Sequence, residues 1–390
     1  MNKYILIVSI ALFFSCSENN NVEEADKSKS DTTQKVIEID SCGLVFEQLD
    51  TFPKINYQTI VIKDWKEYTE LKSKYKYTKD NKEANKAFIT LNRKEFRFVK
   101  VGDSVIVPDK IVGDMRAYSI FPPYYCDAKH LEKLIVVSNE YQCYAAYENG
   151  RLVRFAAANT GKEKTPTFPG RYALVWKDRI RKSSLDSTWV LPYTWNFHRY
   201  AGNAFHQFTM PGRAVSHSCV RQFMSDAKWL YNWGSGVKVD SNRKQIWLSG
   251  TPVIITGMFD YDRKVGPWLD LVDNKTGRIE LKGDPMEVEE AYIPIQQIPE
   301  EIQGWIPNRK RYVAAEDTLI ARGIIDSNIR LIPSVNFNKR RREREAKKRK
   351  DSIRNSQQST QSTDIDLIKQ NLEQLEGKEI DIKKDSTEKK

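Results

Sequence analysis

An Asn-Gly pair between two apolar runs constrains the fold of this chain more than any other local feature. Residues 142–147 and 152–158 are rich in Ala, Tyr and Phe, and a polar stretch separates them. Asn149 and Gly150 both tolerate a positive φ, which a tight turn between antiparallel strands requires. The sequence therefore predicts a β-hairpin at this point, within a strand-rich core that starts near Leu131.

The segments around the hairpin extend the β-rich pattern. The apolar run 134–137 predicts one more strand, and residues 250–256 predict a strand that returns to the core. Residues 225–233 predict a helix that Ser225 caps and Gly234 ends. We therefore expect a mainly β domain over residues 131–258, a compact barrel or sandwich with short helices.

The regions on either side of this domain carry weaker patterns. Residues 36–110 predict a small α+β unit, because Trp65, Tyr68, Leu71 and Tyr75 recur at helical spacing and 96–99 and 104–107 read as short strands around a turn. Residues 285–333 predict an appended segment of short helical pieces, which prolines keep short. No role follows from the sequence of that segment.

Charge is concentrated near the C-terminus. The chain has a formal net charge of +11, and Lys339–Arg354 holds ten Lys or Arg against three Asp or Glu, a net of +7. The folded body is therefore only mildly basic, which argues against nucleic acid as a partner. Residues 339–354 predict a solvated helix in a tail, 336–390, that is basic and then disordered. The basic run either contacts anionic lipid or wall polymers or is only solvated.

The N-terminus has the pattern of an export signal. Lys3 precedes an apolar run, 4–14, that is too short to span a bilayer. The run ends in LFFSC, which resembles the lipobox of bacterial lipoproteins. That resemblance implies that 1–16 is the signal, that Cys16 carries lipid in a membrane facing the periplasm, and that 17–35 is a disordered tether. An Asp directly after the lipidated Cys favours retention in the inner membrane, so Ser17 at that position favours the outer membrane. The alternative to a lipoprotein signal is a plain signal peptide.

The remaining cysteines leave their pairing open. A bridge between Cys126 and Cys143 or between Cys42 and Cys126 is possible in an oxidising compartment, and so are free buried thiols. The chain contains no CxxC pair and no Cys/His spacing of the kind that binds metals. We therefore expect neither a metal nor another cofactor.

One cysteine stands in a setting suited to catalysis. The chain reads SHSCVR from Ser216 to Arg221, and Cys219 lies thirteen residues after His206. A thiol with a pKa of about 8.5 is mostly protonated near neutral pH, and a neighbouring imidazole can accept its proton. The sequence therefore predicts Cys219 as a nucleophile and His206 as its general base and acid.

This motif resembles the Ser/Thr-His-Gly-Cys signature of YkuD-type L,D-transpeptidases. The segment TGKEKTPTFPG at 160–170 resembles the Thr-Gly, Thr-Pro-Thr-Pro-x-Gly stretch of that family, with Phe168 where Pro is frequent. The resemblance covers about 131–256. Residues 91–108 faintly resemble the end of a LysM glycan-binding module, and a purely structural subdomain is the alternative.

The resemblance implies a reaction and a partner. The donor would be a tetrapeptide stem of peptidoglycan, from which Cys219 releases D-Ala as an acyl-enzyme forms, and an amine of a second stem would complete a crosslink. The backbone N–H groups of Ser218 and Cys219 would bind the oxyanion. Water as acceptor would make the protein an L,D-carboxypeptidase or another cysteine amide hydrolase, and lost activity would leave a wall-binding lipoprotein.

The other motif residues have supporting roles by the same resemblance. Ser216 and His217 would shape the loop through hydrogen bonds, and Arg221 would brace it or hold a substrate carboxylate. Two departures stand out: Ser218 occupies the position of the family's usual Gly, and the loop after His206 is shorter than in many members. His198 and His130 lie outside the motif, where a lone histidine is usually structural.

Overall fold

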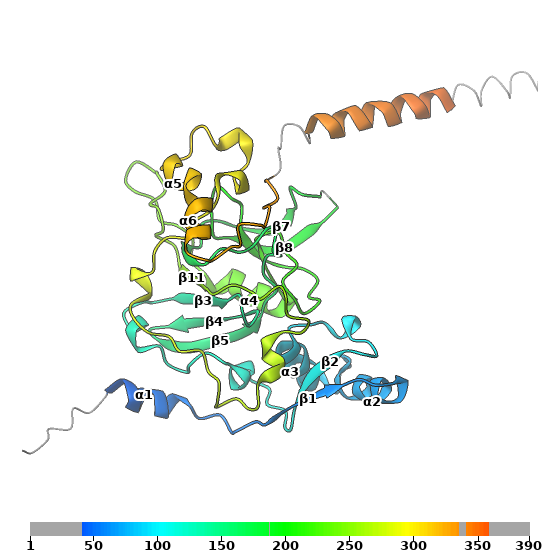
Figure 1. Ribbon diagram of the computed structural model, residues 1–390, viewed down its shortest axis with the longest axis vertical. Helices are drawn as coiled ribbons and strands as arrows, with labels where there is room; N and C mark the ends of the chain where they lie inside the picture. Colours follow the sequence, from blue (N-terminus) through cyan, green and yellow to red (C-terminus); the bar gives the residue numbers. More distant parts are fainter. Residues whose placement is uncertain (1–40, 187, 335–340, 359–390) are drawn as a thin grey trace, which may run out of the picture. The chain divides into compact units, whose positions relative to one another are not determined.

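The computed structural model describes residues 41–186, 188–334 and 341–358, and strands dominate its centre (Figure 1). A five-stranded sheet has the order β5-β4-β3-β11-β6, a four-stranded sheet has the order β10-β9-β8-β7, and β1 pairs with β2. The described sheets have edge strands and do not close into a barrel. Of the two expected architectures, barrel and sandwich, the structure therefore shows the sandwich.

The strands are β1 (Tyr57–Val61), β2 (Ser104–Pro108), β3 (Leu134–Ser138), β4 (Cys143–Glu148), β5 (Arg151–Ala157), β6 (Gly170–Ala173), β7 (Lys177–Lys182), β8 (Val190–Asn196), β9 (Ala204–Gln207), β10 (Val220–Gln222) and β11 (Pro252–Thr256). The α-helices are α1 (Ser41–Leu49), α2 (Trp65–Tyr75), α3 (Lys82–Asn92), α4 (Met224–Trp233), α5 (Arg309–Val313) and α6 (Ala315–Ala321). Residues 341–358 form one more helix, whose described side chains are all exposed. In the part of the chain described, no helix combines the length and apolarity that crossing a bilayer requires.

Strand β3 is buried on both faces, which explains its unbroken apolar run. Leu134 and Val136 pack in a cluster with α3 and β2, whereas Ile135 and Val137 pack in a second cluster with residues of β8, β9 and β10. Because successive side chains of a strand point to opposite faces, the five-stranded sheet separates these two cores. The four-stranded sheet, which carries the cysteine motif, therefore covers one face of the five-stranded sheet.

The predicted hairpin is formed by β4 and β5, which pair antiparallel. Asn149 has φ 47° and Gly150 has φ 77°, the positive values of the expected turn. A side chain at Gly150 would also lie 2.7 Å from the carbonyl oxygen of Tyr125. Glycine is therefore needed here both for its backbone freedom and for lack of space.

The region before the hairpin differs from the prediction in one element. Helix α2 lies where the helical spacing predicted it. Residues 96–98, however, form a 3₁₀ turn and not a strand, so β2 pairs with β1 and not with that segment. Phe96 packs against α2 and α3, and a single 3₁₀ turn can bury its ring there as well as a strand could. Ala87 and Leu91 of α3 belong to the same cluster as β3, so this region shares a core with the sheet.

The helix after the cysteine motif begins earlier than predicted. Helix α4 starts at Met224 with Phe223 as its N-cap, so the predicted cap, Ser225, lies inside the first turn. Gly234 ends the helix as expected. Phe223 is 9% exposed and makes no side-chain cap hydrogen bond, so the helix starts without the predicted cap.

A disulfide joins Cys42 to Cys126, with 5.8 Å between the Cα atoms. This is one of the two pairings that the sequence allowed. Cys143 is a buried free thiol on β4, and burial raises its pKa to about 11. The bridge therefore ties the segment before β1 to the loop before β3.

Candidate active site

Two short parallel strands bring the motif histidine and cysteine to one part of the sheet. Strand β10 pairs with β9 so that Arg221 lies opposite His206 and Val220 opposite Phe205. Cys219 directly precedes β10 and forms a hydrogen bond with the backbone of Ala204, two residues before His206. Because side chains two residues apart share a face, Cys219, Arg221 and His206 lie on the same face of these strands.

His206 is held as a neutral imidazole. Its Nδ1 lies 3.0 Å from the carbonyl oxygen of Gln207, and since a carbonyl only accepts, Nδ1 carries the proton and Nε2 keeps its lone pair. Burial lowers the pKa of His206 to about 4, with a further lowering by the charge of Arg221. The side chain is therefore a proton acceptor at neutral pH.

Cys219 is half-buried and lines a cavity of about 450 Å³. Burial raises the pKa of its thiol, although the backbone of Ala204 and the charge of Arg221 partly oppose that effect. The resting pair is therefore a neutral thiol and a neutral imidazole. Ser218 and His217 line the same cavity, whereas His206, at 4% exposed, does not.

The segment that follows the hairpin holds the cysteine motif from one side. The Ser216 N–H donates to the carbonyl oxygen of Thr160 at 2.9 Å, and Thr165 Oγ1 donates to the Ser216 carbonyl oxygen at 3.2 Å. Gly161 pairs with Ser216, and a side chain there would lie 2.2 Å from the Thr165 carbonyl oxygen. The glycine therefore lets this segment pass close enough to support the motif.

Ser218 departs from its expected role. Its backbone N–H donates to the Thr165 carbonyl oxygen at 3.0 Å, so in this conformation it does not serve an oxyanion. Its φ is 65°, in the left-handed region that favours glycine. This bond and the contact of Thr167 Oγ1 with the Ser218 carbonyl oxygen at 3.2 Å hold the strained residue in place. Because this amide is engaged with Thr165 here, the expectation that it binds the oxyanion stays a prediction.

Arg221 contacts the loop that leads from His206 to the motif. Its Nη1 donates to the carbonyl oxygen of Thr209 at 3.2 Å, its Nη2 donates to that of Val215 at 3.5 Å, and the guanidinium lies over the ring of Phe208 at 4.7 Å. These contacts favour the bracing role over a contact with substrate. His217 Nε2 lies 3.4 Å from Lys162 Nζ, and its ring lies near Trp189.

Sequence reasoning missed one wall of the cysteine cavity. Gln297, Pro299, Ile302 and residues 332–334, all from the segment without an assigned role, line it. The Ile332 N–H donates to the Lys164 carbonyl oxygen at 2.8 Å, beside the residues that hold Ser218. No local pattern in the sequence could have indicated this, because the contact joins residues far apart in the chain.

The β7–β8 hairpin supplies further lining residues. Arg181, Leu191 and Thr194 of this hairpin line the cavity. The aromatic stretch 189–197 contributes to both the core and the cavity: Trp195 and Phe197 are buried in the core, and Leu191 and Thr194 line the cavity.

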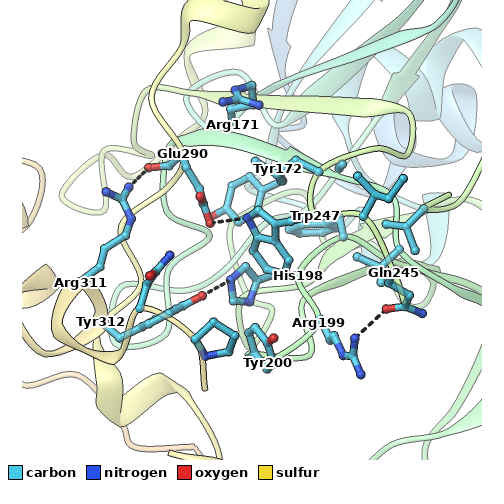
Figure 2. A pocket seen from close by; sticks show the side chains of 18 residues that line it. Arg171, Tyr172, His198, Arg199, Tyr200, Gln245, Trp247, Glu290, Arg311 and Tyr312 are labelled. Carbon is cyan, nitrogen blue, oxygen red and sulfur yellow. Dashed lines mark hydrogen bonds between the residues drawn. The ribbon is translucent and has the colours of Figure 1, made fainter. Parts of the chain in front are cut away.

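Neither of the two histidines outside the motif lines the cysteine cavity. His130 is half-exposed, with its Nε2 3.5 Å from Asp284. His198 is 4% exposed, and burial lowers its pKa to about 3. It lines a second cavity, with its Nε2 3.4 Å from the hydroxyl of Tyr312 (Figure 2). Among the described residues, no group of three His, Cys, Asp or Glu side chains is placed to hold a metal ion.

Comparison with known proteins identifies the segment that carries this site. Residues 132–255 match the family model of the YkuD L,D-transpeptidase catalytic domain. Similar solved structures include an L,D-transpeptidase from Stackebrandtia nassauensis (24% identity, 34% of this chain and 58% of that one, TM-score 0.28) and one from Mycobacterium smegmatis (18% identity, 32% and 59%, TM-score 0.26). This chain thus spans about three fifths of the length of these relatives. A search of curated proteins found no match.

Proposed function

We propose that this protein is an L,D-transpeptidase that acts on peptidoglycan stem peptides, with Cys219 as nucleophile and His206 as general base and acid. One observation carries the proposal. The segment that matches the L,D-transpeptidase catalytic-domain family holds, at two paired strands, a thiol that lines a cavity and an imidazole kept neutral by burial.

The neutral resting pair implies the order of proton transfer. His206 Nε2 takes the thiol proton as Cys219 Sγ attacks the carbonyl carbon between the third and fourth residues of a stem. The Cys219 backbone N–H is the proposed donor to the oxyanion, since the amide of Ser218 is engaged with Thr165. His206 then protonates the departing amine of D-Ala, which leaves a thioester on Cys219.

The second half of the reaction returns the enzyme. An amine of another stem attacks the thioester, His206 accepts a proton from that amine, and the proton passes to the departing sulfur. The product is a crosslink between two third residues, and water in place of the amine would release a tripeptide. The choice between these acceptors depends on what the cavity walls admit.

The experiment follows products formed from disaccharide-tetrapeptides by mass spectrometry. Crosslinked dimers with release of D-Ala support the transpeptidase. Tripeptides alone would replace it with an L,D-carboxypeptidase, and no turnover would favour a wall-binding protein in which the strained Ser218 marks a site that has lost activity. A Cys219→Ala variant that still forms dimers would refute the mechanism, and a carbapenem adduct on Cys219 would support a reactive thiol independently of the substrate.

Export and lipid attachment at Cys16 are part of the proposal, because they would place the protein in the compartment that contains peptidoglycan. Cys16 lies outside the described residues, so its support is the lipobox-like sequence alone. Labelled fatty acid should enter the wild-type protein in cells and not the Cys16→Ser variant. Equal labelling of both would remove the anchor from the proposal.

A further inference from the structure

A second cavity, of about 290 Å³, shares lining residues with the cysteine cavity, and several aromatic rings line it together with aliphatic and charged side chains. We call it the aromatic cavity and define it by His198, Tyr200, Trp247 and Tyr312 (Figure 2). His198 and Tyr200 follow β8, Trp247 precedes β11, and Tyr312 lies in α5. The cavity is thus built between the β domain and the same C-terminal segment that lines the cysteine cavity.

The rings form a platform that is open to solvent at one side. Tyr200 and Trp247 are stacked, with centroids 5.7 Å apart and planes at 21°. Trp247 is 43% exposed, so a ligand in the cavity can reach its ring. His198 is fixed behind them, because its Nδ1 accepts the Ala201 N–H at 3.0 Å and its low pKa keeps it uncharged. The platform is therefore rigid and carries no charge of its own.

Planar polar groups surround the rings. Arg199 Nη1 donates to Gln245 Oε1 at 2.7 Å, and Trp247 Nε1 donates to Glu290 Oε1 at 3.2 Å (Figure 2). A guanidinium has five N–H donors and an amide has two, so these side chains have further donors for vicinal hydroxyl groups. Rings with a negative face attract the C–H face of a saccharide, and flanking planar donors fix its hydroxyls.

Two residues connect the aromatic cavity to the proposed catalytic cavity. Arg199 and Tyr200 line both. One extended ligand can therefore occupy the two cavities at once, with a ring in one and a peptide in the other. The volume of the aromatic cavity, near the lower limit of about 300 Å³ for small-ligand sites, suits a ligand part the size of a sugar ring.

We propose that the aromatic cavity is a saccharide subsite that binds a sugar ring of the glycan strand whose stem peptide reaches Cys219. This inference rests on the proposed function for the identity of the sugar. It assigns to Trp247 a contact with the glycan and to the C-terminal segment, through Tyr312, a part in substrate recognition.

Binding is tested without chemistry, on the full chain carrying Cys219→Ala. Peptide-free glycan strands from peptidoglycan are titrated into this protein in a calorimeter. The titration is repeated with the double variant Cys219→Ala/Trp247→Ala. We expect Trp247→Ala to weaken binding at least tenfold, since central aromatic side chains dominate binding sites. Trp247→Phe keeps a ring and should stay within about threefold, and Trp65→Ala, at a tryptophan that is 73% exposed in α2, should not change binding.

Turnover separates this inference from the proposed function. In the otherwise wild-type protein, Trp247→Ala should raise KM for a disaccharide-tetrapeptide about tenfold and leave kcat/KM for the free tetrapeptide unchanged. If neither substrate is turned over by the wild type, the proposed function fails while the calorimetry still decides the saccharide subsite. Glycan binding that is absent, or equal in Trp247→Ala and Trp65→Ala, would overturn the subsite. An equal loss with both substrates would assign the cavity to the peptide and overturn it too.

Discussion

Replacing Ser218 tests whether the residue before the cysteine is held in a strained backbone conformation. Its φ of 65° costs an L-residue about 1–2 kcal/mol, a cost that glycine does not carry. Glycine in turn loses more entropy on folding, about 0.5–1 kcal/mol relative to alanine. Ser218→Ala and Ser218→Gly both remove the hydroxyl and its 3.4 Å contact with the Thr165 carbonyl oxygen, so their difference isolates the backbone. We therefore expect the Gly variant to be more stable than the Ala variant by about 0.5–1 kcal/mol.

The control is the same pair of variants at a residue with ordinary backbone. Ser225 is exposed inside the first turn of α4, where alanine should be more stable than glycine by about 1 kcal/mol. Urea unfolding at pH 7 measures the free energy of unfolding for all four variants. The reasoning predicts opposite signs of the Ala-to-Gly difference at the two positions. A Ser218→Ala variant at least as stable as Ser218→Gly would refute it.

Three further predictions follow from other contacts. Arg221→Ala should lower kcat/KM more than tenfold and increase amide exchange in the loop 208–215, because the guanidinium bonds Thr209; unchanged exchange would contradict the bracing role. Reducing the Cys42–Cys126 bridge should lower the free energy of unfolding by about 2–4 kcal/mol, measured in urea with and without reductant, and equal midpoints would contradict it. The pKa of His198, about 3, lies below that of the unfolded chain, so the unfolded state binds more protons and stability should fall as pH drops from about 6.5 toward 3; His198→Gln should flatten this slope by up to about 1.4 kcal/mol per pH unit, and an unchanged slope would exclude the effect.

Local patterns were sufficient for several elements. The Asn149-Gly150 turn, the helical spacing of α2 and the end of α4 at Gly234 were all predictable, because each depends on backbone preferences of a few neighbouring residues. The same reasoning failed at residues 96–98, where packing of Phe96 between α2 and α3 set the conformation. The start of α4 also differs from the prediction, since Phe223 is the N-cap and Ser225 has no capping role.

The candidate site shows the same division. The residue types, Cys219 and His206, and their short separation could be read from the sequence, since the chemistry of a thiol and an imidazole depends on the side chains themselves. The sequence could not show that the imidazole is neutral with its proton on Nδ1, because burial and the Gln207 carbonyl oxygen decide both. It also could not show that Thr165 occupies the Ser218 amide.

The amino-acid sequence by itself determined the hairpin and the mainly β class, and it supplied the candidate nucleophile, Cys219, with its proposed base, His206. Only the tertiary structure decided what surrounds them. Residues from the appended segment 285–333 line both cavities, and Ser218 is held at a positive φ by a segment more than fifty residues earlier. Turn and helix preferences act between neighbours along the chain. Cavity walls, amide partners and pKa shifts arise from contacts between distant segments, which exist only once the sheets have packed.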